Sequence, residues 1–192
     1  MSQPFHNRKE IVMRKSFIAL ALLAAMGSAQ AASNAEITIT GNVVKVTCDV
    51  SLSKTALDLG NWAPADFTAA STPVTGSIKQ FTVSLNDCAG TPLAGEQASL
   101  LVSGQTLAGF NSIFQGSAGD NGNVGVMIAP VATPTAYISA GDSILNTTAG
   151  TPPALSDFNG QEIALQAGLA SSSATAQTGT VHAPILFSFA YN

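Results

Sequence analysis

The last twelve residues of this 192-residue chain constrain its fold more than any other segment. Apolar residues recur there at every second position, and alternate side chains of an extended strand point to the same face. The predicted apolar face consists of Val181, Ala183, Ile185, Phe187, Phe189 and Tyr191. Residues 185–192 carry no charge, so an open edge on this strand would promote aggregation. Because the sequence stops at Asn192, we expect a strand supplied from elsewhere to cover this edge by β-strand addition.

A second alternating segment, near the other end of the chain, has the pattern of a strand that could be donated. The residues on its apolar face are Ala35, Ile37, Ile39, Gly41 and Val43, and the intervening positions are polar. A glycine in a strand often marks a close backbone approach. We therefore expect Gly41 to pass over a crowded point in an acceptor.

The residues ahead of this segment predict a signal peptide. Arg14 and Lys15 precede an apolar run over residues 17–26, and Ala29-Gln30-Ala31 matches an A-x-A cleavage site. The run is shorter than the roughly 20 residues that span a bilayer. We expect Met13 to be the true start and cleavage to follow Ala31, so that residues 1–31 are absent from the mature chain.

The composition of residues 32–192 argues against several classes of function. Three lysines face ten acidic residues, which gives a formal charge of −7 and disfavours nucleic acids and anionic membranes as partners. No nucleophile–base pair, carboxylate pair or ligand cluster suggests an enzyme, a metal site or a cofactor. His182 is predicted to point away from the apolar face. The aspartates beside turn residues are expected to cap backbone amides, and Trp62 is more simply a core or loop residue than a sugar platform.

Cys48 and Cys88 are the only two cysteines, and both follow the predicted signal peptide. An even count in an exported chain predicts a disulfide. The loop of about 40 residues would stabilise the fold by roughly 3–4 kcal/mol in the chain-entropy model. A metal site is the alternative, but His182 is the only histidine after residue 31.

The rest of the chain predicts a single all-β sandwich with Greek-key crossings. Short apolar runs are separated by Gly, Pro, Asn, Asp and Ser at intervals typical of sandwiches. Pro184 removes one ladder donor, so the last strand should be an edge strand or contain an irregularity. The predicted strands are 37–50, 55–59, 78–85, 98–102, 124–128, 137–139, 162–169 and 180–191.

Several of these segments resemble the pilin subunits of bacterial chaperone–usher fimbriae, and the major subunits of type 1 fimbriae in particular. Tyr191 is the penultimate residue and Gly179 the fourteenth from the end, as in that family's C-terminal signature. The resemblance extends over essentially all of residues 32–192. Its other motifs are Gly41-Asn-Val-Val44, Leu57-Asp-Leu-Gly60, Phe81-Thr-Val-Ser-Leu-Asn-Asp-Cys88 and Asn123-Val-Gly-Val-Met-Ile128.

The resemblance implies an incomplete immunoglobulin-like sandwich that lacks its last strand and is completed by donor-strand complementation. Residues 32–47 would form the donor extension and residues 48–192 the pilin domain. A periplasmic chaperone would first fill the gap, and the extension of another subunit would replace it at an outer-membrane usher, giving an extracellular fimbria. The acceptor residues would be Gly179, Val181, Ile185, Phe187, Phe189, Tyr191 and Asn192, with the terminal carboxylate presented to the chaperone.

Two alternatives stay open at this point. The chain could be a minor tip or adaptor subunit, because such a subunit has the same two ends. Residues 36–46 could also insert into the groove of their own molecule, which would give a stable monomer.

Overall fold

The computed structural model describes Gly41, residues 43–116 and residues 122–192. The chain divides into two units, Met1–Asn42 and Val43–Asn192, and every described strand belongs to the second. Among the described residues, no helix is long and apolar enough to cross a membrane.

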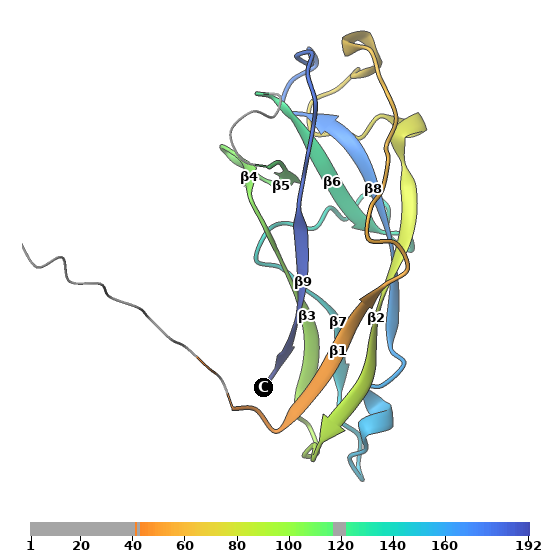
Figure 1. Ribbon diagram of the computed structural model, residues 1–192, viewed down its shortest axis with the longest axis vertical. Helices are drawn as coiled ribbons and strands as arrows, with labels where there is room; N and C mark the ends of the chain where they lie inside the picture. Colours follow the sequence, from red (N-terminus) through yellow and green to blue (C-terminus); the bar gives the residue numbers. More distant parts are fainter. Residues whose placement is uncertain (1–40, 42, 117–121) are drawn as a thin grey trace, which may run out of the picture. The chain divides into compact units, whose positions relative to one another are not determined.

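The described strands of the second unit form two antiparallel sheets (Figure 1). The six-stranded sheet has the order β1 (Val46–Leu52), β2 (Lys79–Gly90), β8 (Glu162–Ser171), β6 (Val124–Pro130), β5 (Phe110–Phe114) and β4 (Thr106–Leu107). The three-stranded sheet has the order β7 (Ser143–Thr148), β3 (Gln97–Gly104) and β9 (Ile185–Tyr191). The chain crosses between the two sheets repeatedly, and the prediction of an all-β sandwich is confirmed.

The main core lies between the inner faces of these sheets. In β2 the alternating residues Phe81, Val83 and Leu85 are buried, as the period of two in the sequence requires. They pack against residues of both sheets, including Leu100, Ile128, Leu165 and Phe187. Because Phe187 belongs to β9, the terminal strand is part of the core.

Several strand predictions are confirmed with shifted ends, and two are wrong. Residues 137–139 form no strand, although the Ile138 amide donates to the Ile128 carbonyl at 2.9 Å. Residues 55–59 also form no strand. The last strand begins at Ile185 rather than at residue 180, directly after Pro184, which cannot donate to a ladder. Residues 37–40 lie outside the described residues, and β1 begins only at Val46.

Strands β4, β5 and β7 were not predicted from the sequence. In β7 the alternation is broken by Leu145, whose φ of 49° lies in the left-handed region that non-glycine residues seldom adopt. The register of β3 against β7 shifts between Ala98 and Leu100. A bulge of this kind removes the regular apolar period on which the prediction depended.

A disulfide joins Cys48 of β1 to Cys88 of β2, so the predicted bond is confirmed. The register of these two strands shifts between Thr47 and Asp49, at the position of Cys48. Opposite this shift, Asp87 takes a φ of 49°. The extra residue of the bulge leaves the two cysteines facing each other.

In the described part of the chain, three 3-10 turns lie in the loops: η2 (Pro64–Asp66), η3 (Thr75–Ser77) and η4 (Leu155–Asp157). Aspartates cap backbone amides at two of them, as predicted. The Ala63 amide donates to Asp66 Oδ2 at 2.7 Å, and the Gly150 amide donates to Asp157 Oδ2 at 2.8 Å.

Candidate binding groove

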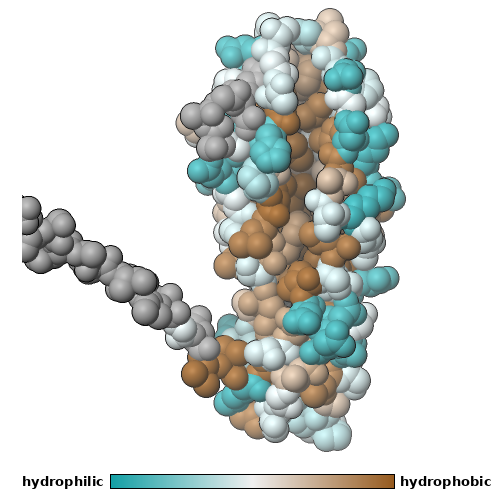
Figure 2. All heavy atoms as spheres, viewed as in Figure 1, coloured by the Kyte–Doolittle hydropathy of each residue, from teal (hydrophilic) through white to brown (hydrophobic). Residues whose placement is uncertain are grey.

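A groove of about 1280 Å³ opens directly onto the core. One wall is formed by β9 and the segment before it, and the other by residues 52–62, which run from the last residue of β1 to Trp62. Its floor includes Phe81, Val126 and Ile128 of the six-stranded sheet. Figure 2 shows this face of the molecule, where a continuous apolar band is bordered by polar residues. Core residues of this kind are normally covered by a further element.

The first wall presents an unpaired strand edge. Of the described strands, β9 pairs with β3 alone. Gln97 and Asn192 exchange two backbone hydrogen bonds, of 2.8 and 3.0 Å. In an antiparallel ladder such pairs alternate with non-bonded pairs. The N–H and C=O groups of Tyr191, Phe189, Phe187 and Ile185 therefore point to the edge of β9 that β3 leaves open.

Beyond Ser53, the second wall is extended chain that pairs with none of the described strands. The Ser53 amide donates to the Thr82 carbonyl at 2.9 Å, and among the described residues no backbone–backbone hydrogen bond is made by residues 54–61 beyond it. Leu57 and Leu59 are nevertheless half-buried, while Ala56, Asp58 and Gly60 between and beside them are exposed. The segment thus has the alternation of a strand without its ladder, which explains why the predicted strand 55–59 did not appear.

One end of the groove is lined by Trp62. Its indole N–H donates to the Leu59 carbonyl at 2.7 Å. The ring packs against a cluster that includes Phe67, Val74, Val124 and Val181. Trp62 is therefore part of the wall, as the simpler of its two interpretations predicted.

Trp62 fits there because residue 76 is glycine. A Cβ atom on Gly76 would lie 2.2 Å from Trp62 Cη2, much closer than atoms can approach. Gly76→Ala is expected to displace the indole and to lower the stability by about 1–3 kcal/mol. Trp62 is the only tryptophan, so its emission spectrum reports the displacement directly. Gly150→Ala is the control, since its Cβ would meet nothing closer than 3.5 Å. Equal emission spectra for the two variants would contradict the prediction.

The structure places the predicted acceptor residues in two groups. Gly179, Val181, Ile185 and Phe187 line the groove. The other three, Phe189, Tyr191 and Asn192, lie beyond its end. His182 is exposed, as the alternation predicted.

Most of the predicted donor residues belong to the part of the chain that the structure does not describe. Ala35, Ile37 and Ile39 lie outside the described residues. Gly41 and Val43 are exposed. The groove residues Leu57, Leu59 and Trp62 were not predicted as site residues, although the alternation of the two leucines was a usable signal.

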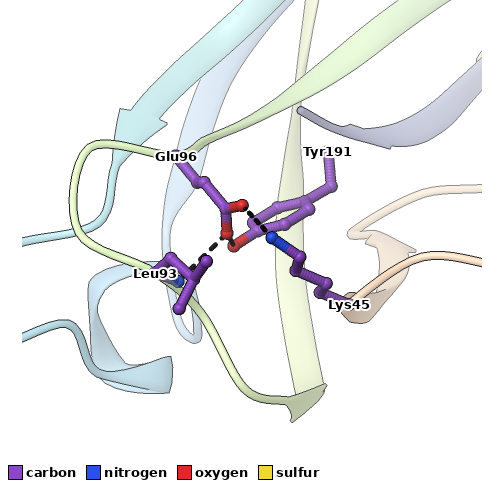
Figure 3. A network of polar contacts seen from close by, with 4 residues as sticks. All are labelled: Lys45, Leu93, Glu96 and Tyr191. Carbon is purple, nitrogen blue, oxygen red and sulfur yellow. Dashed lines mark hydrogen bonds and ion pairs between the residues drawn. The ribbon is translucent and has the colours of Figure 1, made fainter.

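Beyond the end of the groove, Glu96 holds three groups together (Figure 3). Lys45 Nζ donates to Glu96 Oε1 at 2.7 Å. The Tyr191 hydroxyl and the Leu93 amide both donate to Oε2, the amide at 3.0 Å. The Tyr191 ring lies edge-on to Phe158, with ring centroids 5.8 Å apart. We call Lys45, Glu96 and Tyr191 the clasp.

The clasp should make the stability of the fold depend on pH. The hydrogen bond from Lys45, and then that from Tyr191, lowers the pKa of Glu96 below its ordinary value. A carboxyl with a depressed folded pKa stabilises the fold above its unfolded pKa, and this contribution is lost as the pH falls through the folded pKa. The difference in unfolding midpoint between the wild type and Glu96→Gln should therefore be largest at neutral pH and should shrink only as the pH falls below about 4.5, the ordinary pKa of a glutamate. Thermal unfolding measures both, and a constant difference would contradict the prediction.

Among residues 43–116 and 122–192, no group of three or more His, Cys, Asp or Glu side chains could hold a metal ion. The groove itself is lined mainly by aliphatic and aromatic side chains. Its exposed backbone groups and apolar floor suit an extended peptide strand better than a small polar ligand.

No protein-family model matches the sequence. No curated protein matches it either. Solved structures do match. The P pilus rod subunit PapA is 16% identical with a TM-score of 0.53, and the match covers 76% of this chain and 99% of that one. The chain has the fold of a pilus subunit.

A second structure shares this fold. It is the antigen and type I fimbria protein of Burkholderia pseudomallei, with 18% identity and a TM-score of 0.52 over 76% of this chain and 99% of that one. A chaperone–usher pilus structure also matches, at 14% identity and a TM-score of 0.46, over 86% of this chain and all of the other. The two matches with TM-scores of 0.53 and 0.52, together with the two-sheet architecture, confirm the expected immunoglobulin-like pilin fold.

Proposed function

We propose that this protein is a structural subunit of a chaperone–usher fimbria and polymerises by donor-strand exchange. The pilin domain begins with β1 at Val46, two residues earlier than the sequence alone indicated, and the segment from residue 32 to residue 44 forms the extension that fills the groove of another copy. The observation that carries this proposal is the groove, where an unpaired edge of β9 and an unpaired extended segment flank an open part of the core. An inserted strand would pair with both edges and cover the apolar floor.

The N-terminal segment has the chemistry of that occupant. Ala35, Ile37, Ile39, Gly41 and Val43 would face the floor of the groove, and the backbone would pair with the open edge of β9. Burying each large aliphatic side chain is worth about 1.5–3 kcal/mol. Each new ladder hydrogen bond adds about 0.5–1.5 kcal/mol.

The route to the fibre supplies the other proposed partners. A periplasmic chaperone lends a strand to the groove first and receives the carboxylate of Asn192. An outer-membrane usher then exchanges that strand for the extension of the next subunit, and the fibre lies outside the cell. Neither step needs a cofactor or a catalytic residue.

A tip or adaptor subunit would use the same groove, so the position in the fibre needs its own experiment. We expect deletion of the gene to remove the long shafts from the cell surface, as seen by negative-stain electron microscopy. Shafts of normal number and length without the gene product would assign the protein to the tip instead.

Deletion of Ala32–Val44 tests the exchange itself. The variant should form no polymer, because the groove remains and the donor is gone. Addition of a synthetic peptide of residues 32–45 should raise its unfolding midpoint and change the emission of Trp62, which lines the groove. A peptide with Ile37 and Ile39 replaced by aspartate is the matched control.

The outcome is read on a denaturing gel without heating, since strand-exchanged polymers dissociate slowly. SDS-resistant ladders formed by the deletion variant would rule out the donor role of the segment. So would equal effects of the two peptides on Trp62 emission.

A further inference from the structure

The N-terminal segment joins the described domain at Lys45. Val46 is completely buried, in a cluster with Ala98, Ala149 and Phe158. The Lys45 carbonyl accepts a hydrogen bond of 3.1 Å from the Thr91 amide. Val43 is fully exposed and Val44 is about half-exposed. Lys45 is therefore the residue at which firm attachment to the domain begins.

The clasp adds a side-chain attachment at the same residue. Its ion pair joins Lys45 to Glu96, and Glu96 in turn holds Tyr191 at the end of β9. An isolated exposed ion pair would contribute little. Here, however, one carboxylate accepts from an ammonium, a hydroxyl and a backbone amide, so its orientation is fixed by three partners.

This attachment lies at one particular end of the groove. Val46 and Tyr191 belong to the same cluster, so β1 begins where β9 ends. If the segment before Lys45 turned back into its own groove, its later residues would lie near Tyr191 and its earlier residues near Ile185. It would then run parallel to β9. A segment from a second molecule has no such constraint and can run antiparallel, which is the more stable pairing per residue.

We propose that the clasp directs the N-terminal segment away from the groove of its own molecule, so that the groove accepts the segment of a second copy. Self-insertion requires the chain to reverse close to Lys45, where the carbonyl and the ammonium are both held. Glu96 is thus a positioning residue that favours insertion between molecules over insertion within one. The inference rests on the proposed function, because it presumes that the groove accepts a strand.

Trypsin tests the attachment, because residues 32–192 contain only Lys45, Lys54 and Lys79 as cleavage sites. The protein used throughout comprises residues 32–192, with the N-terminal segment intact. Glu96→Gln should increase the cleavage rate after Lys45 about tenfold, as expected for loss of a charge-assisted hydrogen bond. Cleavage after the exposed Lys54 should stay unchanged, which shows that the domain is still folded. Lys45→Arg keeps both the ion pair and the cleavage site, and should behave as the wild type.

The partition between monomer and polymer tests the choice of partner. Refolded without other proteins, Glu96→Gln should give a ratio of self-inserted monomer to polymer about tenfold above that of the wild type. Size-exclusion chromatography measures the ratio. Glu162→Gln removes the same charge from an exposed position on β8 and should leave it unchanged.

Three outcomes would overturn the inference. Equal cleavage after Lys45 in the wild type and Glu96→Gln would show that the clasp does not hold the segment. Faster cleavage of Glu96→Gln with an unchanged ratio of monomer to polymer would show that the clasp holds the N-terminal segment but does not direct it away from the groove. Absence of polymer from the wild type under all conditions would overturn the proposed function as well, whereas polymer with an unchanged ratio overturns this inference alone.

Discussion

Replacement of Phe187 by aspartate is expected to leave no folded subunit. Phe187 is 9% exposed, and its ring centroid lies 6.1 Å from that of Phe81 across the core. Loss of a buried phenylalanine costs about 3–5 kcal/mol, before the cost of burying a carboxylate is counted. Natural domains have a total stability of only about 5–15 kcal/mol, and an open groove places this one at the low end of that range.

The neighbouring residue supplies a matched control. Leu186 belongs to the same strand but faces outward and is 62% exposed, so Leu186→Asp should fold normally. Soluble yield and thermal unfolding distinguish the two variants. A normal yield and a cooperative transition for Phe187→Asp would show that β9 is not part of the core.

The alternation of β9 could be predicted from the sequence because it is a local property. Phe187 and Ile185 face the interior for the same reason that His182 and Leu186 face solvent. The start of the strand could not be predicted as readily. Residues 181–183 keep the alternation, but the ladder with β3 begins only at Ile185, directly after Pro184. The start of the strand is therefore defined by its pairing with β3 and not by the alternation.

In the second wall of the groove the alternation predicted a strand that did not form. Leu57 and Leu59 alternate as in a strand, and the sequence therefore predicted one there. A strand also needs a partner, and the partner of this segment is not among the described residues. The pattern was correct and the pairing was missing, which is the physical reason for the error.

The clasp could not be predicted at all from local patterns. Glu96 and Tyr191 are 95 residues apart, and Lys45 and Glu96 are 51 apart. Only the pairing of β3 with β9 and of β1 with β2 brings the three side chains together. The resemblance to pilins assigned Tyr191 to the acceptor groove. In the structure its ring packs on Phe158 and its hydroxyl donates to Glu96.

The disulfide variant Cys48→Ser/Cys88→Ser is expected to lose about 3–4 kcal/mol of stability, the chain-entropy value for its loop of 40 residues. For a domain of this size the loss corresponds to about 6–16 °C in the unfolding midpoint. The loop contains the groove wall formed by residues 52–62, and β1 is an edge strand paired with β2 alone among the described strands. Without the disulfide, no covalent bond holds β1 and this wall next to β2, so both can detach from β2 more easily.

Loss of the disulfide should leave a subunit with an empty groove less stable than a subunit with an inserted strand. Both lose the same bond, but the inserted strand adds its own binding free energy to the folded state. Thermal unfolding of the double variant with and without the peptide of residues 32–45 separates these contributions, and wild-type protein kept reduced should reproduce the variant. An unchanged midpoint in the double variant would mean that the bulge at Asp87 and the ladder of β1 with β2 hold the edge strand without the covalent bond.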